Sequence, residues 1–146
     1  MSSAPATAVG LMLRAAARRD NPGFEHYREH MNQEPQEQER LYPLLFEVFR
    51  VVVEWRFAEG GTVEQIRAFL RQPRLLFWPD QGFATDDAEA LIRSVLGERG
   101  LVDGISTGDV VTLRLQTFAY LVEDLGLSDQ ELDALIAGCE ELVAGQ

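Results

Sequence analysis

The stretch from Glu37 to Glu59 most constrains the fold of this chain, because it is apolar around most of a helical circumference. Two sets of apolar residues recur there at helical spacing and cover two neighbouring faces. The first set is Leu41, Leu44, Leu45, Val48, Val52 and Trp55, and the second is Phe46, Phe49, Val53 and Phe57. A helix with so narrow a polar stripe needs other helices packed around it. We therefore predict a long central helix.

One part of this stretch also fits a β-strand. From Val51 to Phe57, apolar and polar residues partly alternate with a period of two, and β-branched and aromatic residues are typical of strands. No helix-breaking residue lies between Pro43 and Gly60. We favour the helix for this reason.

Start and stop signals divide the rest of the chain into further helices. Thr62-Val63-Glu64-Gln65 and Ser128-Asp129-Gln130-Glu131 are capping boxes, Thr85 and Ser106 are candidate N-caps, and Gly126 is a candidate stop. The predicted helices cover about 7–19, 22–32, 62–71, 85–96, 106–125 and 128–143. The segment 33–39 is either a linker or the first turn of the central helix.

These patterns predict an all-α fold. At 146 residues the chain has the length of one domain with a real hydrophobic core. We expect a single helical domain over residues 1–146, with a frayed end at 1–6. The helix from 106 to 125 is the expected main partner of the central helix, in a bundle of about six to seven helices.

Charge and composition exclude several function classes. The 24 acidic residues outnumber 13 basic ones and give a net charge of -11, which repels a phosphate backbone and makes nucleic-acid binding unlikely. A helix-turn-helix over residues 62–86 is therefore only a third alternative, also because its second helix would begin with Asp86 and Asp87. All basic residues are arginine. The chain thus lacks the lysine that Walker motifs and Schiff-base enzymes need.

The sequence also favours a cytoplasmic bacterial protein. The longest apolar run is Val51-Val52-Val53, too short for a membrane span. Arginines follow the apolar stretch of the first twenty residues, which is the wrong order for a secretory signal. Cys139 stands alone and lies on the apolar stripe of the last helix, where a thiol behaves as a small hydrophobe with a raised pKa.

The two histidines of the chain, His26 and His30, are four residues apart, with Glu29 just before the second. On a helix both imidazoles lie on one side, where they can share a divalent metal ion such as zinc, and the carboxylate can act as general base. A zinc site needs further ligands, and the many carboxylates of the chain single out none. The alternative is a solvated helix face beside a buried stripe of Phe24, Tyr27 and Met31.

The string from Gly23 to Met31 resembles the signature of the inverzincin metalloproteases, the pitrilysin and insulinase family. The resemblance implies that His26 and His30 bind zinc, that Glu29 activates water, and that a downstream glutamate completes the site. It covers nine residues, and an alanine-rich helix precedes the motif here.

A second candidate site is the aromatic segment from Pro73 to Phe83. Arginine and tryptophan dominate the energetics of protein interfaces, so an exposed segment of this kind would bind a partner. The candidate partner-binding residues are Arg74, Phe77, Trp78 and Phe83. The alternative is that the aromatic residues fold back into the core.

From these observations we expect a non-catalytic protein-interaction or regulatory module without a cofactor. It would bind a protein partner or a second copy of itself, through residues 73–83 or through a face of the central helix. The competing class is a metal-dependent enzyme or metal sensor that uses His26, His30 and Glu29.

Overall fold

The computed structural model describes residues 4–59, 61–72 and 84–145, and seven helices form the regular structure of these ranges. They are α1 (Ala8–Ala17), α2 (Asn21–Gln33), α3 (Pro35–Arg56), α4 (Val63–Arg71), α5 (Thr85–Val95), α6 (Thr107–Leu125) and α7 (Asp129–Ala144). These ranges contain no strand. The predicted all-α bundle of six to seven helices is confirmed.

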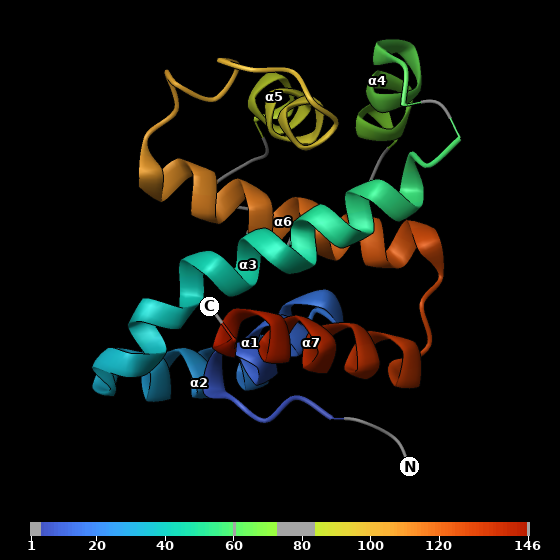
Figure 1. The fold of residues 1–146 in the computed structure, drawn as a ribbon. Coiled ribbons are helices and arrows are strands. Elements are labelled where there is room, and N and C mark those ends of the chain that lie inside the picture. The colour runs from blue at the N-terminus through green and yellow to red at the C-terminus, as the bar shows by residue number, and fades with distance from the viewer. Residues whose placement is uncertain (1–3, 60, 73–83, 146) are drawn as a thin grey trace.

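The helices form three layers (Figure 1). The short helices α4 and α5 pack on each other at one end, α3 and α6 cross in the middle, and α1, α2 and α7 form the opposite layer. The helix α3 contacts both outer layers, because it packs against α1, α2, α5, α6 and α7. The apolar stretch predicted from Glu37 to Glu59 is therefore a central helix, with α6 as its main partner.

Residues 51–56 continue α3, so the strand alternative for this segment is wrong. Pro43 lies inside the helix without ending it. The segment predicted as linker or first turn is the first turn, because α3 already begins at Pro35 and Glu34 alone separates it from α2.

The predicted helix ends depend on local hydrogen bonds and are mostly confirmed. Thr62 and Ser128 form complete capping boxes, and the Ser106 hydroxyl accepts a hydrogen bond from the Asp109 N–H. Gly126 ends α6 in the left-handed conformation that favours glycine. Thr85 as an N-cap is wrong: it is the first residue of α5, and Ala84 precedes it without a side-chain cap.

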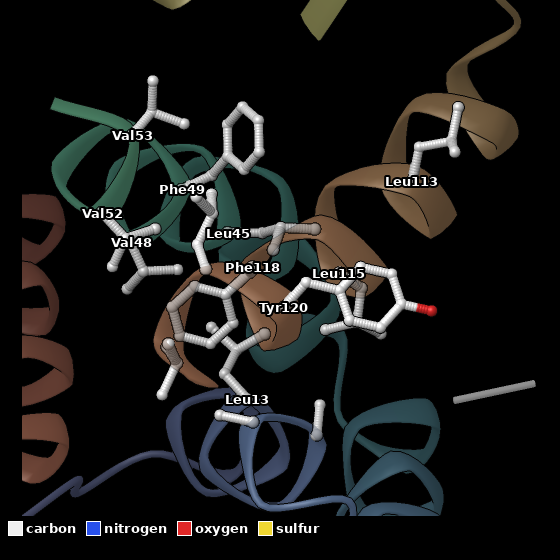
Figure 2. Packing of buried hydrophobic residues seen from close by; sticks show 14 of the residues in the cluster. Leu13, Leu45, Val48, Phe49, Val52, Val53, Leu113, Leu115, Phe118 and Tyr120 are labelled. Atoms are coloured by element: carbon white, nitrogen blue, oxygen red, sulfur yellow. The ribbon is translucent and has the colours of Figure 1, made fainter. Parts of the chain in front are cut away.

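One hydrophobic core joins the layers, and α6 is its most enclosed element. All residues from Leu113 to Val122 are buried, although amphipathic helices usually keep one face in water. Figure 2 shows Phe118 of α6 near Leu13 of α1 and the apolar face of α3. None of the described helices is both long and apolar enough to cross a membrane.

The N-terminus of α1 is held by two buried glutamates from other helices. The Glu140 carboxylate accepts hydrogen bonds from the backbone N–H groups of Ala6 and Thr7, at 3.0 and 2.8 Å, and from the Thr7 hydroxyl. Glu37 accepts one from the Val9 N–H at 3.2 Å. A helix N-terminus attracts negative charge, so these contacts fix α1 against α7 and α3.

Candidate interaction site

The histidine pair lies on the solvent-facing side of α2. Its rings are adjacent, with centroids 4.8 Å apart and planes at 69°. Both His26 and His30 are exposed, whereas Phe24 and Met31 are buried and Tyr27 is half-buried. The two imidazoles therefore lie beside the buried side of α2, as the helical spacing predicts.

No third ligand joins the two imidazoles in the described part of the chain. No group of three or more His, Cys, Asp or Glu side chains there could hold a metal ion. Glu29 is exposed on α2 and does not complete such a group. The geometry thus offers two ligands, whereas zinc sites use three or four protein ligands.

The predicted partner-binding residues Arg74, Phe77, Trp78 and Phe83 lie outside the described residues. The expectation about residues 73–83 stays a prediction.

Cys139 is buried on α7, as the sequence predicts. Burial raises the pKa of its thiol to about 11, and the Glu47 carboxylate adds to the rise. A thiol with so high a pKa is a poor nucleophile at neutral pH. Its place in the fold is that of a small core residue.

The helices α4 and α5, which would form the DNA-reading unit, carry paired arginines. Glu89 of α5 accepts hydrogen bonds from Arg67 of α4 and from Arg93, and Arg93 also binds Glu98. The hydrogen bond from Arg67 contributes most to lowering the pKa of Glu89. These two arginines are occupied by carboxylates, which does not favour phosphate binding.

A cluster that the sequence analysis did not single out lies between α3 and α6. The guanidinium carbon of Arg114 is 5.2 Å from the ring centroid of Tyr42 and 5.0 Å from that of Phe46. Arg114 is only 8% exposed, Phe46 is half-buried, and Tyr42 is 46% exposed. We call these three residues the arginine–aromatic cluster. In this cluster the buried Arg114 guanidinium lies against the half-exposed ring of Tyr42.

A sequence signal for this cluster existed. Arg114 is the only basic residue of α6 and stands among apolar residues on an almost fully buried helix. Charged side chains are rarely buried unless they are paired, so a lone arginine in such a helix indicates a special environment. The nature of that environment depends on which residues of α3 lie opposite, and helical spacing does not contain that information.

A small apolar pocket of about 200 Å³ lies on the α1, α2, α3 and α6 side of the core. Its lining residues are Met12, Phe24, Arg28, Met31, Leu41, Leu45, Val111, Thr112 and Leu115. The one charged residue among them, Arg28, is already bound to Glu25 on the same helix. The pocket thus offers apolar contact without a free charge to orient a ligand.

Comparison with protein-family models, with curated proteins and with solved structures finds no match.

Proposed function

We propose that this protein is a non-catalytic protein-interaction module that binds its partner through the arginine–aromatic cluster. The observation that supports the proposal is the combination of an enclosed Arg114 with a half-exposed Tyr42. Tyrosine and arginine are enriched among residues that dominate binding energy, and such residues lie in well-packed, desolvated surroundings. Both side chains stand on helices of the bundle, so the surface is formed before a partner arrives.

Trp55 provides a matched reference on the same helix. It is 50% exposed, close to the 46% of Tyr42, but stands about 140° away around α3 and far from Arg114. A single exposed apolar residue is normal on protein surfaces. Tyr42 differs from Trp55 in having a buried cation beside it.

Photo-crosslinking in the native cell tests the proposal. A benzophenone amino acid replaces Tyr42 in one variant and Trp55 in another. We expect a defined crosslinked product from position 42 and none from position 55. A product that contains two copies of this chain assigns self-association, and a heterologous product assigns a partner protein. Equal products at both positions, or none at either, would contradict the proposal.

A metal-dependent function at His26 and His30 is the alternative proposal. The adjacent imidazole rings favour it, since residues at i and i+4 on a helix can share one ion. The described residues provide no third ligand, so further ligands would have to come from outside them, for example from a second molecule or from water. Metal analysis of protein purified without a histidine tag separates the two proposals.

A further inference from the structure

The most informative feature of the arginine–aromatic cluster is what Arg114 does not contact. Nine other arginines form ion pairs with Asp or Glu, and they are Arg14, Arg18, Arg19, Arg28, Arg40, Arg50, Arg56, Arg67 and Arg93. Arg114 makes no ion pair within the described residues, although it is more than nine-tenths buried and the chain is rich in carboxylates. The most enclosed arginine of this set is thus the one without an acidic partner.

The nitrogens of Arg114 are correspondingly unsatisfied. Nε is fully enclosed and has no hydrogen-bond partner. Nη1 and Nη2 make no hydrogen bond or ion pair within the described residues, and the guanidinium carbon lies 5.2 Å from the centroid of the half-exposed Tyr42 ring. The two rings stabilise the cation electrostatically, but they offer its N–H groups no oxygen atom. A buried guanidinium without an acceptor is costly in the free protein, and a carboxylate that binds its terminal nitrogens lowers that cost.

We infer that the arginine–aromatic cluster binds a carboxylate group of a partner polypeptide, either an Asp or Glu side chain or a chain terminus. This inference rests on the proposed function and names the chemistry of the partner. A guanidinium presents its donors in a planar fork that matches the two oxygens of a carboxylate. The half-exposed ring of Tyr42 provides an apolar surface for the residue that carries this group.

Charge favours a carboxylate over a phosphate. The cluster contains one cation, which balances the single charge of a carboxylate. A phosphate group carries about -1.5 to -2 at neutral pH and would leave an excess of negative charge in a chain of net charge -11. The same net charge repels an acidic partner at long range. Moderate salt screens that repulsion more than the enclosed contact, so binding should not weaken between low and physiological ionic strength.

Nuclear magnetic resonance of the full chain tests the inference through the Nε–H signal of Arg114. The probes are N-acetylphenylalanine, which has a terminal carboxylate, the blocked dipeptide N-acetyl-phenylalanyl-glutamate amide, which has a side-chain carboxylate, and N-acetylphenylalanine amide, which has none. Inorganic phosphate is a fourth probe. We expect one or both carboxylate probes to shift the Nε–H signal with saturation, and the amide and phosphate to leave it in place.

Variants at position 114 add a second readout. Arg114→Met keeps a long apolar side chain without the charge, and Arg114→Lys keeps the charge without the fork. We expect carboxylate affinity to fall about tenfold to a hundredfold in Arg114→Met and less in Arg114→Lys. Arg99→Met, at an exposed arginine, is the control and should bind like the wild type. The wild-type titration needs no variant, so the test holds even if Arg114→Met folds poorly.

Each outcome decides between named alternatives. Equal shifts with the amide and the carboxylate probes overturn the carboxylate inference but leave the surface as an interaction site. A larger shift with phosphate overturns the choice of anion. No Nε–H shift with either carboxylate probe overturns the inference, whatever the crosslinking at position 42 shows. Carboxylate binding without a crosslink at position 42 would instead contradict the proposed function.

Discussion

Glu140 and Arg114 are two charged side chains of nearly equal burial, 9% and 8% exposed, with opposite surroundings. The Glu140 carboxylate accepts hydrogen bonds from two backbone N–H groups and one hydroxyl at the start of α1. Arg114 contacts two aromatic rings and has an Nε without an acceptor. One buried charge is satisfied within the fold, and the other is not.

The difference shows that burial alone does not indicate the role of a charged side chain, which depends on whether its hydrogen bonds are satisfied. A buried charge whose donors or acceptors are all occupied contributes to the native structure and has nothing left for a ligand. A buried charge with a free hydrogen-bonding edge costs stability in the free protein and gains an acceptor on binding. Glu140 therefore contributes to the fold, whereas Arg114 keeps the unused hydrogen-bonding capacity on which the proposed recognition rests.

The largest expected effect is that of replacing Glu140, because the backbone N–H groups of Ala6 and Thr7, just before α1, would lose their charged acceptor. We expect Glu140→Gln to lower the free energy of unfolding by about 2–3 kcal/mol, measured by urea denaturation. Glu141→Gln, at the exposed neighbouring position, is the control and should change it by less than about 0.5 kcal/mol. If both variants lowered the free energy of unfolding by the same small amount, Glu140 would have no special structural role and its contrast with Arg114 would fail.

Substitutions at two glycines, Gly10 and Gly138, test the role of Glu140 by steric hindrance. A Cβ on Gly10 would collide with the Glu140 carboxylate and approach the Thr7 hydroxyl to 3.0 Å. We expect Gly10→Ala to destabilise the protein by about 1–2 kcal/mol, although alanine is the better helix former. Gly138→Ala is the matched control in α7, with nothing within 4 Å, and should stabilise by about 0.5–1 kcal/mol. Thermal unfolding of both variants gives the sign.

Arg114 should behave differently when its charge alone is removed. We expect Arg114→Met to stay within about 1 kcal/mol of the wild type, because an apolar side chain of similar length often replaces a buried charge at no cost. Arg114→Ala should lose about 2 kcal/mol, since it also removes packing against the rings. If Arg114→Met lost as much as Glu140→Gln, the cation would be structural after all.

Cys139 differs from Glu140 and Arg114 because this buried titratable group remains neutral. Burial raises the pKa of its thiol to about 11, above the value in the unfolded chain. The unfolded state therefore releases the proton first, and the stability that this thiol contributes is complete below about pH 9 and is lost as the pH rises toward 11. Cys139→Ala should flatten this part of the stability profile. Rapid alkylation of the native protein at pH 8 would contradict the raised pKa.

The smallest effects are expected for the histidine pair, which is exposed and thus pays no cost of burial. Replacing both His26 and His30 by Ala should change the free energy of unfolding by less than about 0.5 kcal/mol. Because the described residues offer two ligands and no third, the purified untagged protein should hold less than about a tenth of an equivalent of zinc. Stoichiometric zinc that is lost in the double variant would revive the metal alternative.

The helices could be predicted from the sequence far better than the candidate site. The capping boxes at Thr62 and Ser128 and the stop at Gly126 depend on residues within one turn, so the sequence contains what is needed to place them. Thr85 failed as a cap because α5 begins one residue earlier than its local pattern indicates. The apolar faces of residues 41–57 likewise predicted a central helix without any knowledge of its neighbours.

The site depended on contacts between distant segments. The His26–His30 motif could be recognised because it is local, whereas the absence of a third ligand among the described residues follows only from the packing of the helices. The surroundings of Arg114 could not be predicted from its own segment, because Tyr42 and Phe46 lie in another helix far away in the sequence. A pattern with a period of one helical turn contains no information about which helix lies opposite.

The sequence alone therefore determined that this chain is a bundle of helices and which segments form them, and its net charge predicts that nucleic acid is an unfavourable partner. These properties follow from hydrogen bonds within a turn, from apolar spacing and from net charge. Only the tertiary structure decided which charges are satisfied. Glu140 meets Thr7 across 133 residues of chain, while Arg114 meets aromatic rings in place of a carboxylate. Helix packing determines both sets of contacts, and they distinguish a charge whose hydrogen bonds are satisfied from one whose Nε has no acceptor.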